Sequence, residues 1–180
     1  MTTTRTSTGP TVLGIGNPLM GDDGVGITLL DELMANPLRI PGRPVEFVDG
    51  GTIGMSLLPL VLDAGSLLVL DAVADGAPGT VVQLSGDQLP RLLRMKLSPH
   101  QVGLLDVLAS ARLLGSEPSR VAVVGIAPAY VDMRLGLSPE VAAAVPQALA
   151  TASRVLRDWS LADAEAAGPV DQPLVGGRSC

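Results

Sequence analysis

The sequence predicts an α/β fold, a three-layer α/β/α sandwich in which helices cover both faces of a mostly parallel, five-stranded twisted sheet. Two observations predict it. Short runs rich in valine, leucine and isoleucine alternate with segments whose apolar residues have helical spacing, as in parallel strands joined by helical crossovers. At 180 residues and 47% hydrophobic, the chain is long enough for one well-buried domain and short for two.

The elements are expected within one domain at 11–160, between a flexible lead at 1–10 and a disordered tail at 161–180. The expected strands are 11–15, 44–48, 66–70, 80–84 and 120–126. The expected helices are 25–36, 55–62, 99–113 and 138–159.

Local signals set the boundaries in the first half of the chain. The first helical pattern stops before Pro37, because the proline ring excludes a continuing helix. The second strand ends at Asp49 and a glycine pair, and the third strand ends at Asp71. The helix between these two strands is expected despite Pro59.

Turn and capping signals set the boundaries in the second half. The turn cluster at 75–79 brings the fourth strand close behind the third, so we expect a hairpin-like, antiparallel approach at a sheet edge. Ser98, Pro99 and Gln101 have the order of a capping box with proline at the first helical position. The segment 138–140 opens the last helix in a similar way, and that helix continues through an internal proline.

Composition excludes several classes of partner. The net charge of -6, the scattered basic residues and the presence of only three aromatic residues argue against binding to nucleic acid. Every apolar stretch is interrupted well before the ~20 residues of a membrane helix, and residues 1–9 lack the apolar core of a signal peptide. We therefore expect a cytoplasmic protein. Cys180, the single cysteine, permits neither an intrachain disulfide nor a cysteine-based zinc site.

A glycine-rich loop follows the first strand. Gly16 and Gly21 have the spacing of a phosphate-binding loop, but Asp22 and Asp23 occupy the places of the lysine and the hydroxyl residue that bind phosphate. Leu19 replaces the third glycine of a dinucleotide-binding motif. Two carboxylates at this position would repel phosphate and attract a cation. The alternative is that the glycines form a simple turn and the aspartates cap the next helix.

Acidic residues follow three of the expected strands, and the chain's single histidine begins a helix. Ligands of open α/β sheets bind at the carboxyl ends of strands. Asp22 and Asp23 follow the first strand, Asp49 ends the second and Asp71 ends the third, so these acidic residues are expected to converge there. His100 is expected in the first turn of a helix, whose positive end favours the neutral, metal-ligating imidazole. The alternative for His100 is an ordinary surface or core histidine.

Two further groups of residues have open interpretations. Asp49, with the two glycines that follow it, shapes a substrate cleft or simply forms a turn. Arg91, Arg94 and Lys96 precede the histidine, where they contact an acidic substrate tail or form a solvated helix face.

Five segments together resemble the [NiFe]-hydrogenase maturation endopeptidases, and the resemblance extends over roughly 12–159 in the same order. The segments are GIGNPLMGDDGVG at 14–26, DGGTIGM at 49–55, LDAV at 70–73, APGT at 77–80 and SPHQVGL at 98–104. The resemblance implies a small cytoplasmic protein with a five-stranded sheet. It also implies an enzyme that removes the C-terminal extension of the hydrogenase large-subunit precursor after nickel insertion.

The resemblance further implies a catalytic and metal-binding trio, Asp23, Asp71 and His100. Carboxylate and imidazole ligands suit nickel or another divalent cation, and three protein ligands leave coordination positions open. In one mechanism the trio recognises nickel already held by the precursor; in another it holds a catalytic metal that polarises the scissile carbonyl or activates water. A third mechanism, proton sharing between Asp22 and Asp23, is disfavoured because adjacent side chains usually point apart.

Two other functions compete with the peptidase. A nickel chaperone would use the same three ligands without cutting a peptide. A nucleotide-binding switch would need phosphate-binding residues, which the two aspartates of the loop contradict. The low aromatic content offers no evident hot spot for self-association, so we expect a monomer.

Overall fold

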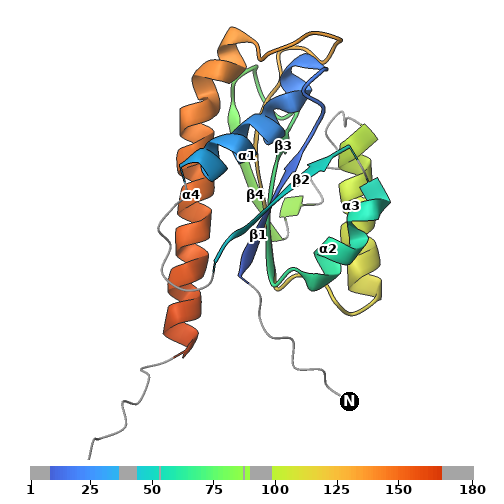
Figure 1. Ribbon diagram of the computed structural model, residues 1–180, viewed down its shortest axis with the longest axis vertical. Coiled ribbons are helices and arrows are strands. Elements are labelled where there is room, and N and C mark those ends of the chain that lie inside the picture. Colours follow the sequence, from blue (N-terminus) through green and yellow to red (C-terminus); the bar gives the residue numbers. More distant parts are fainter. Residues whose placement is uncertain (1–8, 37–43, 53, 87, 90–98, 168–180) are drawn as a thin grey trace, which may run out of the picture.

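The computed structural model describes residues 9–36, 44–52, 54–86, 88–89 and 99–167, with side chains in the last range described from 103 onward (Figure 1). Its strands are β1 (Pro10–Ile15), β2 (Glu46–Gly51), β3 (Ser66–Ala72), β4 (Val81–Ser85) and β5 (Arg120–Ile126). Its α-helices are α1 (Val25–Ala35), α2 (Leu58–Asp63), α3 (Pro99–Leu113) and α4 (Pro139–Ala167). Two 3-10 helices precede helices α1 and α2, namely η1 (Gly21–Gly24) and η2 (Gly54–Leu57).

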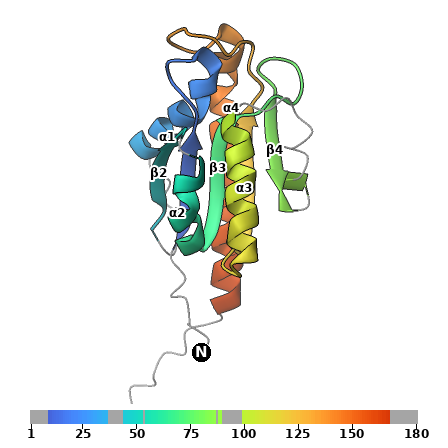
Figure 2. The same ribbon diagram turned by 90° about the vertical axis from the view of Figure 1, so that its right-hand side faces the viewer.

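The five strands form one sheet in the order β2-β1-β3-β5-β4. Strands β2, β1, β3 and β5 are parallel, and β4 pairs antiparallel with β5 at one edge. Helices α1 and α4 cover one face of the sheet, and α2 and α3 cover the other (Figures 1 and 2). The predicted α/β/α sandwich with a mostly parallel sheet is confirmed.

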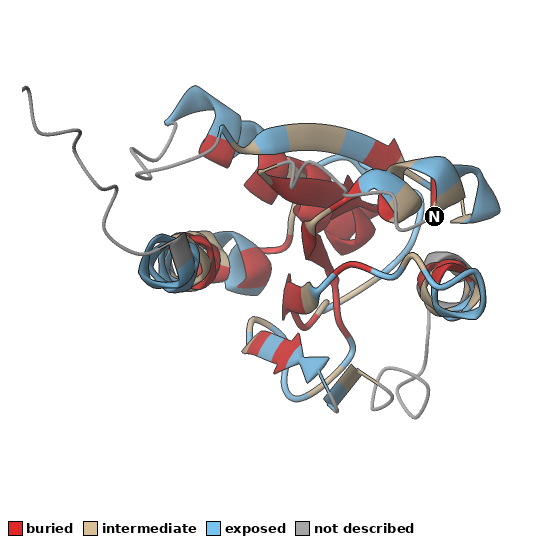
Figure 3. Ribbon diagram, turned by 90° about the horizontal axis from the view of Figure 1, so that it is seen from below, coloured by how far each residue is buried: buried red, intermediate tan, exposed pale blue. Residues whose placement is uncertain are grey.

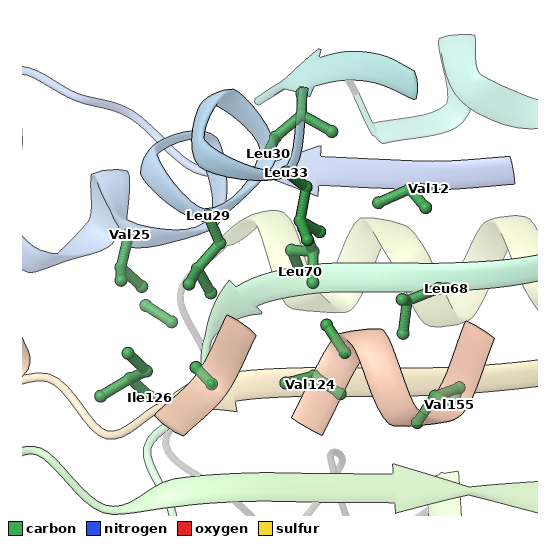
Figure 4. Packing of buried hydrophobic residues seen from close by; sticks show 14 of the residues in the cluster. Val12, Val25, Leu29, Leu30, Leu33, Leu68, Leu70, Val124, Ile126 and Val155 are labelled. Atoms are coloured by element: carbon green, nitrogen blue, oxygen red, sulfur yellow. The ribbon is translucent and has the colours of Figure 1, made fainter. Parts of the chain in front are cut away.

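Each face of the sheet has its own apolar core, because successive side chains of a buried strand point to opposite faces. On one face Val12, Leu68 and Val124 pack with residues of α1 and α4, as Figure 4 shows. On the other face Leu13 and Val69 belong to a second cluster with residues of α2 and α3. Viewed from below, the central strands are buried while the outer surfaces of the helices are exposed (Figure 3).

Strand β4 differs from the expected hairpin. It lies antiparallel at an edge as predicted, but its partner is β5 and not β3. The reason is that β3 is central, with both of its edges already paired, to β1 and to β5. Backbone hydrogen bonds of 2.8 Å from Gly79 to Ala127 and from Ala127 to Thr80 join the segment before β4 to the end of β5.

Most of the other differences from the expected boundaries are one or two residues, and three are larger or change the type of element. Helix α4 extends to Ala167, so 161–167 form part of a helix and not a tail. The helix expected at 55–62 is divided into η2 and the short helix α2. Strand β2 continues past Asp49 to Gly51. Among the described residues, no helix combines the length and the apolar character needed to cross a membrane.

Candidate active site at the carboxyl edge of the sheet

The carboxyl ends of β1 and β3 bring two of the predicted site residues to one edge of the sheet. The two strands are parallel neighbours, and Gly14 of β1 is paired with Leu70 of β3. Asp71 follows Leu70 directly, and η1, which contains Asp23, packs against β3. The sequence expectation that Asp23 and Asp71 approach each other at the carboxyl edge of the sheet is therefore supported by the topology.

Asp23 is held by the loop that precedes it. Its side chain is 1% exposed, and Oδ2 accepts a 2.9 Å hydrogen bond from the backbone N–H of Asn17. The loop folds back this closely because residue 16 is a glycine with a φ of 130°: a Cβ there would lie 1.8 Å from the Asp23 carbonyl oxygen. The glycine-rich loop therefore holds a carboxylate, as its unusual charge suggested.

Asp71 is the penultimate residue of β3 and is 2% exposed. Its Oδ1 accepts a 2.7 Å hydrogen bond from the backbone N–H of Ala72. The residue opposite it on β5 is Gly125, where a Cβ would lie 2.6 Å from the Asp71 carbonyl oxygen. Burial of an ionised carboxylate is costly without compensating partners, so two buried carboxylates at one sheet edge are unusual for a purely structural role.

His100 is the second residue of α3, which begins at Pro99 as the capping signal predicted. Helix α3 packs against η2, the element that follows the carboxyl end of β2. A Cβ at Gly103 would lie 3.0 Å from the Cα of Gly54, so this contact brings the first turn of α3 close to the same edge of the sheet. The side chain of His100 lies outside the described residues.

The proposed metal-binding trio therefore stays a prediction. Among the side chains that the structure describes, which do not include His100, no three histidine, cysteine, aspartate or glutamate residues form a group able to hold a metal. Asp71 lies at the end of β3, Asp23 lies in η1, which packs against β3, and the backbone of His100 is in the first turn of the helix that approaches this edge.

Asp22 has a different role from its neighbour. It is 0% exposed, and its oxygens accept hydrogen bonds from three backbone N–H groups: those of Ala129 (2.8 Å), Tyr130 (3.3 Å) and Ser138 (2.6 Å). These donors lie in the loop between β5 and α4 and at the start of α4. With both oxygens engaged in this way, Asp22 is poorly placed to share a proton with Asp23, and its function is to fasten η1 to that loop.

Asp49 forms a turn. It is exposed within β2, and its Oδ1 accepts a 2.8 Å hydrogen bond from the backbone N–H of Gly51, which has a φ of 48°. This contact supports the simpler of the two interpretations of Asp49. Arg91, Arg94 and Lys96, the candidate contacts for an acidic tail, lie outside the described residues.

Sequence reasoning missed Asn17 as a site residue. Its backbone N–H binds Asp23, while its own Oδ1 accepts a 3.0 Å hydrogen bond from the backbone N–H of Leu19. The Asn-Pro pair at 17–18 was the available signal, because asparagine before proline favours the start of a turn. The sequence around Gly125 carried no comparable signal. A glycine is needed there because the backbone of Asp71, on the neighbouring strand β3, leaves no room for a Cβ.

Comparison with known proteins identifies the family. The model of the hydrogenase maturation protease family matches residues 28–155. The chain is 37% identical over 149 residues to the hydrogenase 2 maturation protease of Escherichia coli, covering 82% of this chain and 90% of that protein. It is 42% identical over 153 residues to the hydrogenase expression/formation protein HupD of Rhodobacter capsulatus, covering 83% of this chain and 72% of that protein.

Solved structures agree with the sequence matches. The hydrogenase maturating endopeptidase HybD of Escherichia coli superposes with a TM-score of 0.77 at 36% identity, covering 84% of this chain and 94% of that one. The [NiFe] hydrogenase maturation protease HybD of Thermococcus kodakarensis gives a TM-score of 0.68 at 26% identity, covering 83% and 99% of the two chains. This chain belongs to the hydrogenase maturation protease family.

Proposed function

We propose that this peptidase removes the C-terminal extension of a [NiFe]-hydrogenase large-subunit precursor after nickel has been inserted. The observation that carries the proposal is the burial of Asp71 at the end of β3 and of Asp23 in η1, which packs against β3, in a chain that belongs to this protease family. Ligands and substrates of open α/β sheets bind at that edge. The precursor is the partner, and the peptide bond before its extension is the bond cleaved.

Nickel enters this proposal as cargo of the substrate. Two carboxylates and an imidazole, from Asp23, Asp71 and His100, form a donor set that suits a divalent cation of this kind. Both aspartates are buried and each accepts a hydrogen bond from a backbone N–H, which fixes one oxygen of each carboxylate. We propose that these residues admit only a precursor that already carries nickel, and that the metal polarises groups near the scissile bond when bound.

We also propose that the protein works as a monomer in the cytoplasm. Aromatic residues, which commonly anchor stable protein interfaces, make up 2% of the chain. One cysteine permits no intrachain disulfide, in keeping with a reducing compartment. Sedimentation velocity of the purified chain at micromolar concentration would report a single species of about 18 kDa, in line with the 18.4 kDa of the monomer.

The test of the peptidase is intact-mass analysis of a purified large-subunit precursor, with and without nickel, after incubation with this protein. We expect the C-terminal extension to be lost only from the nickel-loaded precursor. Cleavage regardless of nickel would contradict the recognition mechanism. Nickel transfer to the precursor without cleavage would instead support the nickel chaperone.

A further inference from the structure

Four exposed apolar side chains lie beside the candidate active site. Leu19, on the loop after β1, is 60% exposed, and Val131, Met133 and Leu135, on the loop between β5 and α4, are 47%, 88% and 77% exposed. We call these four residues the apolar rim. Exposed large apolar residues also occur elsewhere in the described chain, and what distinguishes these four is their place next to the loop that holds Asp23.

The two loops are joined by backbone pairing although they are distant in sequence. Met20 and Arg134 form a parallel β-bridge. The backbone N–H of Gly21 donates to the carbonyl of Arg134 over 2.8 Å, and that of Arg134 donates to the carbonyl of Leu19 over 3.1 Å. Both loops lie together at the top of the molecule in Figures 1 and 2.

The loops that carry the rim are held in place by three contacts, one of them to the buried side chain of Asp22. Asp22 accepts backbone hydrogen bonds from Ala129 and Ser138, close to the two ends of the loop that carries most of the rim. Tyr130 fills the space above Gly21, where a Cβ would lie 2.5 Å from its ring. The guanidinium of Arg134 lies over the same ring, 4.6 Å from its centroid. A surface fixed in this way loses little entropy when it binds a partner.

Arg134 also keeps a positive charge within the rim. A side-chain hydrogen bond to Tyr130, with a smaller contribution from Asp132, raises the pKa of the exposed Arg134 above its ordinary value. The loop therefore presents a guanidinium between its apolar residues, next to the side chain of Asp132. Such a mixture is typical of a surface that binds a partner transiently and specifically.

The rim is coupled to Asp23 through a single residue. Asn17 donates its backbone N–H to Asp23 Oδ2 over 2.9 Å and accepts the backbone N–H of Leu19 at its own Oδ1 over 3.0 Å. Leu19 is four residues from Asp23 in the chain. Leu19 of the rim is therefore two hydrogen bonds away from the Asp23 carboxylate, on the same loop.

We propose that the apolar rim is the docking surface for the folded body of the large-subunit precursor, while the precursor's C-terminal segment enters beside Asp23 and Asp71. This inference rests on the proposed function. The occupant is a protein with a complementary apolar patch next to its flexible tail. A second copy of this chain is disfavoured, because seating it on the rim would obstruct the edge of the sheet that a protein substrate must reach.

The test compares two matched double variants. Met133→Ser with Leu135→Ser removes rim side chains that are 88% and 77% exposed, and Leu113→Ser with Leu114→Ser removes control side chains that are 89% and 62% exposed. The control pair lies at the carboxyl end of α3, far from η1 (Figure 1). Serine removes apolar surface without adding charge. Because all four residues are exposed, we expect both variants to fold like the wild type, and circular dichroism would check this.

We expect the rim variant to lose about tenfold in kcat/KM for a nickel-loaded precursor, through KM, with kcat within about twofold of the wild type. Its affinity for immobilised precursor should fall by a similar factor. The control variant should match the wild type in both assays. A rim variant that binds and cleaves as the control does would overturn the docking surface while leaving the peptidase intact, and so would a loss confined to kcat.

Two further outcomes separate the docking surface from the proposed function. A wild-type protein that cleaves no precursor would contradict the peptidase function. The binding assay would still decide the docking surface: weaker binding of the rim variant would support it, and equal binding of the rim variant and the wild type would overturn it. A wild-type dimer in sedimentation velocity that the rim variant abolishes, with processing unchanged, would identify a second copy as the occupant and overturn the proposal.

Discussion

At the scale of single residues, Asp22 and Asp23 are adjacent carboxylates with separate roles. Both oxygens of Asp22 accept hydrogen bonds, from three backbone N–H groups in all, and Oδ2 of Asp23 accepts one from the backbone N–H of Asn17. An asparagine has one carbonyl oxygen and one NH₂ group, so it can still accept the hydrogen bond from Asn17 at position 23 but cannot replace both accepting oxygens of Asp22.

We therefore predict that one asparagine substitution lowers stability and that the other abolishes activity. Asp22→Asn should lower the free energy of unfolding by about 2–4 kcal/mol, because an NH₂ group would face buried backbone donors. Asp23→Asn should abolish processing of the precursor and leave the urea midpoint nearly unchanged. Urea denaturation and intact-mass assays would measure both effects, and a stable Asp22→Asn variant would contradict the anchoring role of this side chain.

Gly16 gives a second prediction at this scale. An added Cβ would lie 1.8 Å from the Asp23 carbonyl oxygen in a backbone with a φ of 130°, so Gly16→Ala must displace the loop that holds Asp23. We expect a loss of about 3 kcal/mol or more in stability, together with loss of processing. Gly136→Ala is the matched control: its φ is 84° but nothing lies within 4 Å of the added Cβ, so it should cost only about 1 kcal/mol.

The sequence predicted the approach of two candidate site residues, Asp23 and Asp71, for a clear reason. Asp23 and Asp71 follow apolar strands, and parallel strands end at one edge, so their approach needed only the order of elements. The anchoring role of Asp22 could not be predicted, because its donors are backbone groups 107 to 116 residues away and carry no side-chain signal.

At the scale of elements, Arg120 attaches the end of α4 to the sheet. Its guanidinium makes a bidentate pair with Asp163 at 2.7 and 2.8 Å and donates to the Trp159 carbonyl over 3.1 Å. It also lies over the Trp159 ring, 5.4 Å from its centroid, and Nε donates to Ser66 Oγ over 3.1 Å. These contacts join the first residues of β3 and β5 to the last turns of α4.

We expect Arg120→Ala to lower the free energy of unfolding by about 1–2 kcal/mol, since several hydrogen bonds and a cation–π contact are lost together. Asp163→Asn should cost less than about 1 kcal/mol, because its side chain is 58% exposed. Both variants should process the precursor normally, since these residues lie at the opposite edge of the sheet from Asp71. Thermal unfolding with a processing assay would test this, and impaired processing at native stability would contradict it.

The elements that the sequence misplaced depend on contacts between distant segments. Strand β5 was predicted at its observed bounds, because a short apolar run rich in valine is a strong local signal for a buried strand. The partner of β4 depends on which strand edges the rest of the sheet leaves open. The extension of α4 through 161–167 is supported by the contact between Asp163 and Arg120, 43 residues apart, which no local pattern records.

At the scale of the whole molecule, the residues of the proposed site come from segments that are far apart in sequence. The end of β3 carries Asp71, η1 carries Asp23, and helix α3 carries His100. The shared sheet edge between β1 and β3, and the packing of α3 on η2, place these elements together. A nickel-recognition site assembled in this way should respond to substitution as one unit.

The last prediction concerns the coupling between Asp71 and His100. We expect Asp71→Asn and His100→Ala each to slow processing of a nickel-loaded precursor by at least about a hundredfold, and the double variant to be no slower than the slower single variant, because one missing ligand already removes metal recognition. Time courses by intact mass would measure the three rates, with circular dichroism to confirm folding. The rim variant, Met133→Ser with Leu135→Ser, is the contrast: combined with His100→Ala it should slow processing further, since docking and metal recognition are separate contacts. Multiplicative losses from Asp71→Asn and His100→Ala would instead mean that the two residues act independently and do not share a nickel ion.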